Sequence, residues 1–143
     1  MIKANDLKPG DLVRVCEDNW QIKKGTICEI LSIDLFHKYC SELNWVTVSN
    51  PNSYIDKVRL RCIDIEGIPL TPEILEKNGF EIREGTVAYA KNRLALKPLD
   101  EGKAYQVGLG SLRLLFVKVR VIKYVHELQH ILWALGLDAN LKI

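Results

Sequence analysis

The chain has 143 residues, of which 48% are hydrophobic and 27% are charged, and its formal net charge is +2. This composition is that of a globular protein and excludes a disordered chain. So small a net charge excludes binding to nucleic acid through overall charge alone, so a nucleic-acid surface would have to be a local cluster of basic side chains.

The chain contains no targeting or membrane pattern that we recognise. Residues 1–9 lack the apolar core of a signal peptide, and no apolar run approaches the roughly 20 residues of a membrane helix. The four cysteines, Cys16, Cys28, Cys40 and Cys62, are spread singly and form no C-x-x-C pair. They are expected to be buried side chains or free thiols. We therefore expect a cytoplasmic protein without membrane contact.

Short strands separated by turns are expected in the first domain, residues 1–66. Alternating or β-branched apolar residues predict strands at residues 12–16, 26–33, 45–48 and 57–62. Four or five short strands with Gly, Pro and Asn turns between them are typical of a small barrel or a strongly bent sheet. Residues 7–13 and 24–27 resemble the first two strands of SH3-like barrels, which implies an N-terminal SH3-like β-barrel.

The second domain, residues 67–143, is expected to begin with a short helix that Thr71 caps and Gly79 ends. Further strands are predicted at residues 80–83, 86–91, 93–97, 105–108 and 112–121. A helix is predicted at residues 122–135, with an apolar stripe of Val125, Leu128, Leu132 and Leu135. Because such a stripe needs a surface to cover, we expect an α+β fold in which the C-terminal helix covers an antiparallel sheet.

Two segments of the second domain carry a resemblance. They are Ile68-Pro-Leu-Thr-Pro-Glu-Ile-Leu-Glu-Lys-Asn-Gly-Phe80 and Lys123-Tyr-Val-His-Glu-Leu-Gln129. Together they resemble uncharacterised small proteins of gut bacteria and their phages, which share an I-P-L-T-x-E-I-L helix and a C-terminal K-Y-V-H-x-L-Q helix. The resemblance implies a phage or other mobile-element origin and no known activity. In that group the positions of Glu127 and His130 are usually Gln and Asn, which implies that the metal-like pattern here arises from two substitutions.

The metal-like pattern is H-E-x-x-H at His126, Glu127 and His130. Histidines four residues apart lie on one helix face, about 5.4 Å apart along the axis, and together they can bind a zinc ion while the glutamate acts as general base. A catalytic zinc ion needs a third protein ligand, and only Asp138 is available downstream. Upstream ligands left open are His37, Cys62 and Glu101. The alternative prediction is therefore a zinc-dependent hydrolase with Glu127 as catalytic base and His126 and His130 as metal ligands.

Basic residues concentrate in the second half of the chain, with few acids between Gly85 and Tyr124. They are Lys91, Arg93, Lys97, Arg113, Lys118, Arg120 and Lys123. In the last strand Val117, Val119 and Val121 are expected on one face, and Lys118 and Arg120 on the other. Such a basic face, beside a tyrosine, suits contacts with phosphates and stacked bases. The alternative is a solvated sheet face with scattered charge.

The leading prediction is a non-enzymatic binding or accessory protein that recognises a protein or a nucleic acid. It has no catalytic residue, no cofactor and no metal. Its predicted binding residues are Arg113, Lys118, Arg120, Lys123, Tyr124, His126 and Gln129. Self-association into a homo-oligomer through an exposed strand edge is also possible.

Overall fold

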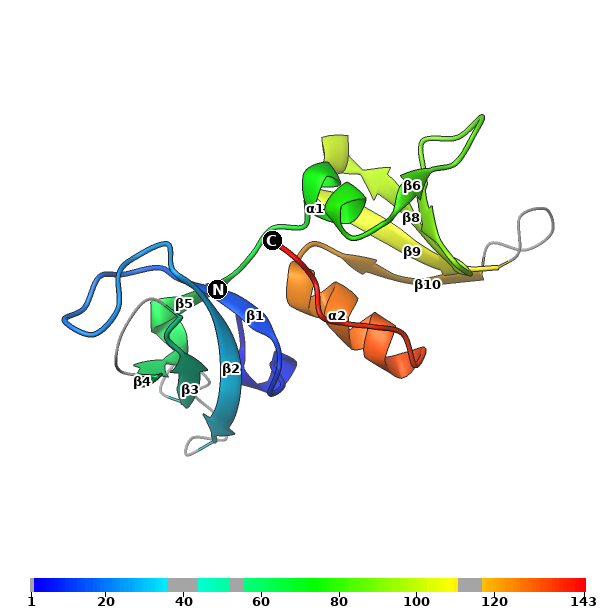
Figure 1. The fold of residues 1–143 in the computed structure, drawn as a ribbon. Helices are drawn as coiled ribbons and strands as arrows, with labels where there is room; N and C mark the ends of the chain where they lie inside the picture. Colours follow the sequence, from blue (N-terminus) through cyan, green and yellow to red (C-terminus); the bar gives the residue numbers. More distant parts are fainter. Residues whose placement is uncertain (1, 36–43, 52–55, 111–116) are drawn as a thin grey trace. The chain divides into compact units, whose positions relative to one another are not determined.

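The computed structural model describes residues 2–35, 44–51, 56–110 and 117–143, with the backbone alone at residues 117 and 118 (Figure 1). The chain divides into two compact units, Met1–Ile68 and Pro69–Ile143. Each unit contains one sheet of five described strands, and every described strand pair is antiparallel. The fold is therefore α+β with two antiparallel sheets, which confirms the predicted class.

The sheet of unit 1 has the order β4-β3-β2-β1-β5, so its last strand returns to pair with its first. The strands are β1 (Leu12–Val15), β2 (Ile27–Asp34), β3 (Trp45–Ser49), β4 (Lys57–Arg61) and β5 (Ile65–Gly67), with the 3-10 turn η3 (Cys62–Asp64) before β5. Burial alternates along β1, β3 and β4 because apolar side chains occupy one face and more polar ones the other. Among the described strands the sheet does not close into a barrel, so the predicted SH3-like barrel is not confirmed.

The core of unit 1 is formed by the inward-facing valine, leucine and isoleucine side chains of these strands, together with two of the cysteines. Cys28 and Cys62 are buried free thiols, and Cys16 is a half-buried one. Burial raises the pKa of Cys28 to about 11. These three cysteines are free, as predicted, whereas Cys40 lies outside the described residues.

The sheet of unit 2 is a meander in which each strand pairs with its neighbour in the sequence, in the order β10-β9-β8-β7-β6. The strands are β6 (Glu81–Ile82), β7 (Tyr89–Lys91), β8 (Leu94–Leu99), β9 (Ala104–Leu109) and β10 (Val117–Ile122). Strand β7 begins three residues later than predicted because residues 83–88 form a closed turn. Strand β8 continues two residues further than predicted, to Leu99, where the 3-10 turn η4 (Asp100–Gly102) begins.

Two helices belong to unit 2 (Figure 1). Helix α1 (Pro72–Lys77) has the predicted N-cap, because the Thr71 side chain accepts a hydrogen bond from the Ile74 N–H at 3.4 Å. Helix α2 (Val125–Ala134) begins three residues later than predicted, because β10 extends to the buried Ile122. Its inner residues Val125, Leu128 and Leu132 are buried, as the apolar stripe predicts.

The chain after α2 returns to α1. The Gln129 side-chain N–H donates to the Ala139 carbonyl at 3.2 Å. Asn78 then forms two hydrogen bonds with the backbone of Lys142, both of 2.8 Å. The last seven residues are thus fixed to both helices of unit 2 by polar contacts.

The described end of the last strand contains an irregularity that the predicted alternation did not include. The pairing of β10 with β9 shifts between Lys118 and Arg120, which makes Val119 a bulge residue. Val119 and Val121 are both exposed, by 49% and 45%. The rest of that prediction, residues 112–116, lies outside the described residues. No helix in the described part of the chain is long and apolar enough to cross a membrane.

Candidate functional site

The side chain of Glu127 is bonded to the backbone at the start of α2. Its carboxylate accepts hydrogen bonds from the backbone N–H groups of Lys123 at 2.7 Å and Tyr124 at 3.0 Å. It also pairs with the Arg120 guanidinium at 3.1 Å. These N–H groups precede the first helical turn and have no partner within the helix, so an acidic side chain at this position caps it. The predicted general base is therefore engaged in holding the helix start.

The two histidines of the H-E-x-x-H pattern belong to a row of aromatic rings along α2. The ring centroids of His126 and His130 lie 5.9 Å apart. Tyr124 stacks on His126 at 5.7 Å, and Trp133 stacks on His130 at 5.9 Å. Within the described residues, no group of three or more His, Cys, Asp or Glu side chains is arranged to hold a metal ion. The zinc alternative therefore finds no third ligand there, and its candidate His37 lies outside the described residues.

Among the predicted binding residues whose side chains the structure describes, two are buried, so these residues do not form one surface. Arg120, Lys123 and Tyr124 meet around the capping carboxylate of Glu127. His126 and Gln129 are 3% and 2% exposed, so neither presents its side chain at the surface. Gln129 instead holds the C-terminal segment. Lys118 is described through its backbone alone, and Arg113 lies outside the described residues.

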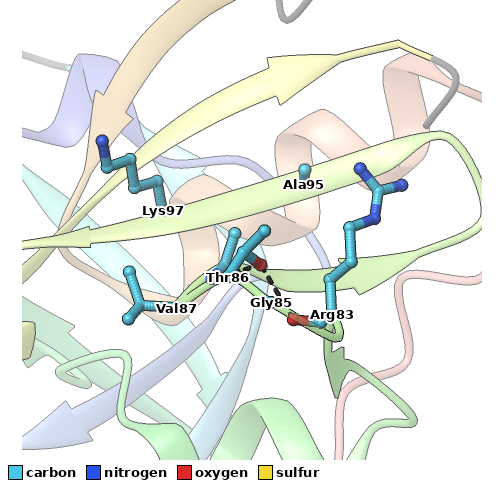
Figure 2. A pocket seen from close by; sticks show the side chains of 7 residues that line it. Arg83, Gly85, Thr86, Val87, Ala95 and Lys97 are labelled. Atoms are coloured by element: carbon cyan, nitrogen blue, oxygen red, sulfur yellow. Dashed lines mark hydrogen bonds between the residues drawn. The ribbon is translucent and has the colours of Figure 1, made fainter. Parts of the chain in front are cut away.

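A different surface, around the connection between β6 and β7, contains an open pocket. The connection is closed by hydrogen bonds: the backbone N–H and the hydroxyl of Thr86 each donate to the Arg83 carbonyl at 3.0 Å. The Ala88 N–H donates to the Thr86 hydroxyl at 3.2 Å, and the Arg83 N–H donates to the Ala88 carbonyl at 3.0 Å. Gly85 supplies the left-handed conformation that such a tight turn requires, at φ +73°. The turn therefore holds the residues beside β8 in a defined position (Figure 2).

We call the first cavity at this turn the cationic pocket. It has a volume of about 830 Å³ and is lined by Arg83, Gly85, Thr86, Val87, Ala88, Ala95 and Lys97. Figure 2 shows Arg83 and Lys97 on either side of Ala95. Because the alanine side chains are small, a ligand can approach close to the backbone of the sheet between the two cations.

The charges of the cationic pocket have no counterion within the described part of the protein. The ion pairs found there involve Arg14, Arg59, Arg61 and Arg120, and none of them includes Arg83 or Lys97. Two cations of like charge beside one open cavity favour an anionic group between them. The arrangement therefore provides a place for a carboxylate or a phosphate.

A second cavity, of about 580 Å³, shares Thr86 and Val87 with the first, and we call it the tyrosine pocket. It is lined largely by apolar and aromatic residues, and also by Asp100 and Glu101. Its remaining lining residues are Pro72, Ile82, Tyr89, Pro98, Leu99, Gly102 and Tyr105. The two pockets thus lie next to each other and carry side chains of opposite charge.

The sequence analysis did not predict these pockets. Lys97 appeared among the basic residues, but Arg83 did not, and neither was expected to bind. The two side chains meet because β7 and β8 pair as a hairpin and the turn of residues 83–88 lies beside the end of β8. The dipeptide Glu84-Gly85, between the strands predicted at residues 80–83 and 86–91, is the one local signal near the site, because a glycine there is typical of a hairpin turn.

No family model matches the chain, and neither a curated protein nor a solved structure matches it. The resemblance to small proteins of gut bacteria and their phages therefore stays a prediction. The candidate site rests on its own geometry.

Proposed function

We propose that the chain is a non-enzymatic binding protein whose second unit binds a segment of a protein partner at the cationic pocket. The partner contributes an acidic side chain that lies between Arg83 and Lys97. The observation that carries this proposal is the pair of cations beside an open cavity, without a carboxylate partner in the described residues. Hydrogen bonds from these cations to a carboxylate are charge-assisted and are therefore stronger than those between neutral groups.

The neighbouring charges favour a protein over a nucleic acid. Asp100 and Glu101 line the tyrosine pocket, which shares two residues with the cationic pocket. A phosphate backbone that extends across both pockets is repelled by these carboxylates, because like charges that face each other oppose binding. A polypeptide places an acidic residue in one pocket and a different residue in the next. Val87, which is 64% exposed, offers it an apolar contact between them.

The test uses three probes on the intact chain: an N-acetylated peptide amide with two adjacent glutamates, its glutamine counterpart, and a single-stranded oligonucleotide. We expect the glutamate peptide to shift the amide resonances of Thr86, Ala88 and Ala95, and the glutamine peptide to leave them unchanged. Arg83→Ala is expected to weaken glutamate-peptide binding by about fivefold, which corresponds to about 1 kcal/mol. Lys142→Ala removes an equal charge from an exposed position outside both pockets and serves as the matched control.

Two outcomes would overturn the proposal. Equal binding of the glutamate and glutamine peptides would remove the role of the cations. Tighter binding of the oligonucleotide, weakened by salt and by Arg83→Ala, would assign the pocket to nucleic acid instead.

We also propose that unit 1 is SH3-like. The strand order β4-β3-β2-β1-β5, with the 3-10 turn η3 between β4 and β5, supports this proposal. An experimental structure that covers residues 36–43 and 52–55 tests it, because these residues complete the connections next to β3. A small sheet of this kind is a scaffold for many unrelated ligands, so its fold alone assigns no partner.

A further inference from the structure

The tyrosine pocket contains a buried polar atom without a partner. Tyr105 is fully buried, and its hydroxyl has no hydrogen-bond partner among the described residues. Tyr89 lies edge-on to the same ring, with the centroids 6.3 Å apart. A buried hydroxyl that forms no hydrogen bond destabilises the folded state, and nearly all such groups in proteins are paired. The hydroxyl of Tyr105 is therefore suited to contact a ligand.

The turn η4 lies against this hydroxyl. A Cβ atom placed on Gly102 would lie 4.0 Å from the Tyr105 oxygen. Three consecutive residues of the turn have positive φ: Asp100 at 47°, Glu101 at 57° and Gly102 at 86°. The left-handed conformation costs a non-glycine residue about 1 to 2 kcal/mol, so this turn stores strain next to the buried hydroxyl.

The electrostatic environment of the pocket is acidic. Asp100 and Glu101 line it, and no lysine or arginine is among its described lining residues. Burial raises the pKa of Tyr89, and the carboxylates of Glu76 and Glu73 on α1 raise it further. Two carboxylates thus line a mostly apolar and aromatic pocket, which favours a ligand with an apolar body and a positive charge.

We propose that the tyrosine pocket binds an organic ammonium group that carries an apolar body. The apolar body packs against Tyr89, Val87 and Pro98. The ammonium lies near Asp100 and Glu101, and one of its N–H groups donates to the Tyr105 hydroxyl oxygen when η4 shifts. The proposal does not depend on the function of the cationic pocket, because its ligand has the opposite charge and its polar contacts, Asp100, Glu101 and Tyr105, do not line that pocket, although Val87 lines both.

The ammonium has two possible sources, a free aromatic amine or a lysine side chain of a partner protein. Both present an N–H donor at the end of an apolar body. Nα-acetyl-lysine methylamide, which keeps its side-chain ammonium, is the probe for a lysine side chain, and phenethylammonium is the probe for a free amine. Comparable affinities assign the pocket to a lysine side chain, whereas binding about tenfold tighter for phenethylammonium assigns it to a free amine.

The experiment titrates the intact chain with phenethylammonium and with two probes of similar shape, the neutral 2-phenylethanol and the anionic 3-phenylpropionate. We expect phenethylammonium to shift the resonances of Gly102 and Tyr105 and to bind about tenfold more tightly than either of the other two probes. The double variant Asp100→Asn/Glu101→Gln keeps the shape of the turn and is expected to weaken binding about tenfold. Glu84→Gln removes an exposed carboxylate that lines neither pocket and serves as its control.

Tyr105→Phe separates the hydroxyl from the shape of the pocket. Because the hydroxyl has no partner in the described fold, its removal should leave the folded state intact, and we expect it to weaken phenethylammonium binding about threefold to tenfold. Equal affinity for the three probes would overturn the proposal. So would binding that survives unchanged in both the Tyr105→Phe variant and the double variant.

Discussion

The two units differ in whether their polar side chains have partners within the described fold. In unit 1 the arginines of the sheet find carboxylates within the fold: Arg14 pairs with Glu66 at 3.6 Å, and Arg59 pairs with Asp34 at 3.0 Å. In unit 2 the cations of the cationic pocket have no counterion among the described residues, and the Tyr105 hydroxyl has no hydrogen-bond partner there. Polar groups that are paired within the fold contribute to its stability, whereas those left unpaired beside a cavity are available to a ligand.

Unit 1 contains a row of basic residues on β4, but this row is not the binding surface that we favour. Lys57, Arg59 and Arg61 lie on the exposed face of β4, and the Arg59 guanidinium lies 5.1 Å from the ring centroid of Trp45. Basic side chains beside an aromatic ring are typical of a nucleic-acid surface. Both arginines are already paired, however: Arg59 with Asp34 at 3.0 Å and Arg61 with Asp64 at 2.8 Å. Their charge is therefore largely compensated within the unit.

Unit 1 presents an apolar contact instead of an unpaired charge. Trp20 is 86% exposed in the connection between β1 and β2. The Asn19 side chain accepts hydrogen bonds from the N–H groups of Gln21 at 2.8 Å and Ile22 at 2.9 Å, and Ile22 is buried. These contacts fix the backbone next to Trp20, and an exposed tryptophan on a fixed backbone is typical of an anchor at an interface.

The largest effect is expected where unit 2 does pair its charges. Glu127→Ala removes the acceptor of two backbone N–H groups and the partner of Arg120, so we expect a loss of about 1 to 3 kcal/mol in the free energy of unfolding. Glu127→Gln retains a capping oxygen and should retain most of the stability. Urea denaturation measures both. An alanine variant as stable as the wild type would show that the cap contributes nothing.

The same region tests the zinc alternative. Metal analysis of the purified protein should be compared with that of His126→Ala. Stoichiometric zinc that is lost in the variant would restore the zinc-dependent hydrolase and would give Glu127 a role beyond capping.

A smaller effect is expected for a paired arginine of unit 1. Arg59→Ala removes the ion pair with Asp34 and the contact with Trp45, and we expect it to lower the free energy of unfolding by about 0.5 to 1.5 kcal/mol. A double-mutant cycle with Asp34→Asn isolates the ion pair, whose coupling should be about 0.2 to 1 kcal/mol and should decrease with salt. A coupling free energy of zero would mean that the ion pair of Arg59 adds nothing to stability, so that Arg59 would not differ from Arg83 and Lys97.

Arg83→Ala and Lys97→Ala are expected to change the free energy of unfolding by no more than about 0.5 kcal/mol, because neither side chain has an ion-pair partner in the described fold. The measurement is the same denaturation series, with Arg59→Ala as the reference for a paired cation. A loss as large as that of Arg59→Ala would mean that these cations stabilise the unit, and the comparison between the units would not hold.

The sequence predicted much of the fold and little of the candidate site. Strands β1 to β4 of unit 1, the capped helix α1 and the apolar stripe of α2 follow from local patterns, because alternation, capping residues and helical spacing act over a few neighbouring residues. Strand β5 was not predicted. The bulge at Val119 was missed, since a shift in pairing depends on the opposite strand. The late start of α2 was missed for a similar reason: Ile122 continues the pairing with β9.

The site was missed because its residues become neighbours only through pairing. Arg83 and Lys97 are 14 positions apart, and the rings of Tyr89 and Tyr105, 16 positions apart, become neighbours only because β7, β8 and β9 pair. The H-E-x-x-H pattern is a poor guide for the opposite reason. Its residues are close in the sequence, but Glu127 caps the helix and His126 is buried, neither of which the spacing of the letters reveals.

The smallest effect at neutral pH is expected for Tyr105→Phe, because the hydroxyl that it removes has no partner in the described fold. Removal of an unsatisfied buried hydroxyl is nearly neutral or slightly stabilising. The difference should appear at alkaline pH. Burial, with the neighbouring Tyr89 and Glu73, raises the pKa of Tyr105 from 10.0 to about 12.

The folded protein therefore keeps the Tyr105 proton after the unfolded chain has lost it. The stability that this proton contributes is complete below pH 10 and is lost as the pH rises to about 12. Tyr105→Phe has no such proton, so its stability should decline less than that of the wild type between pH 10 and 12. Urea denaturation from pH 7 to 11 measures both proteins. Parallel pH profiles would mean that the hydroxyl is solvated in the folded state, and Tyr105 would then belong with the satisfied groups of unit 1.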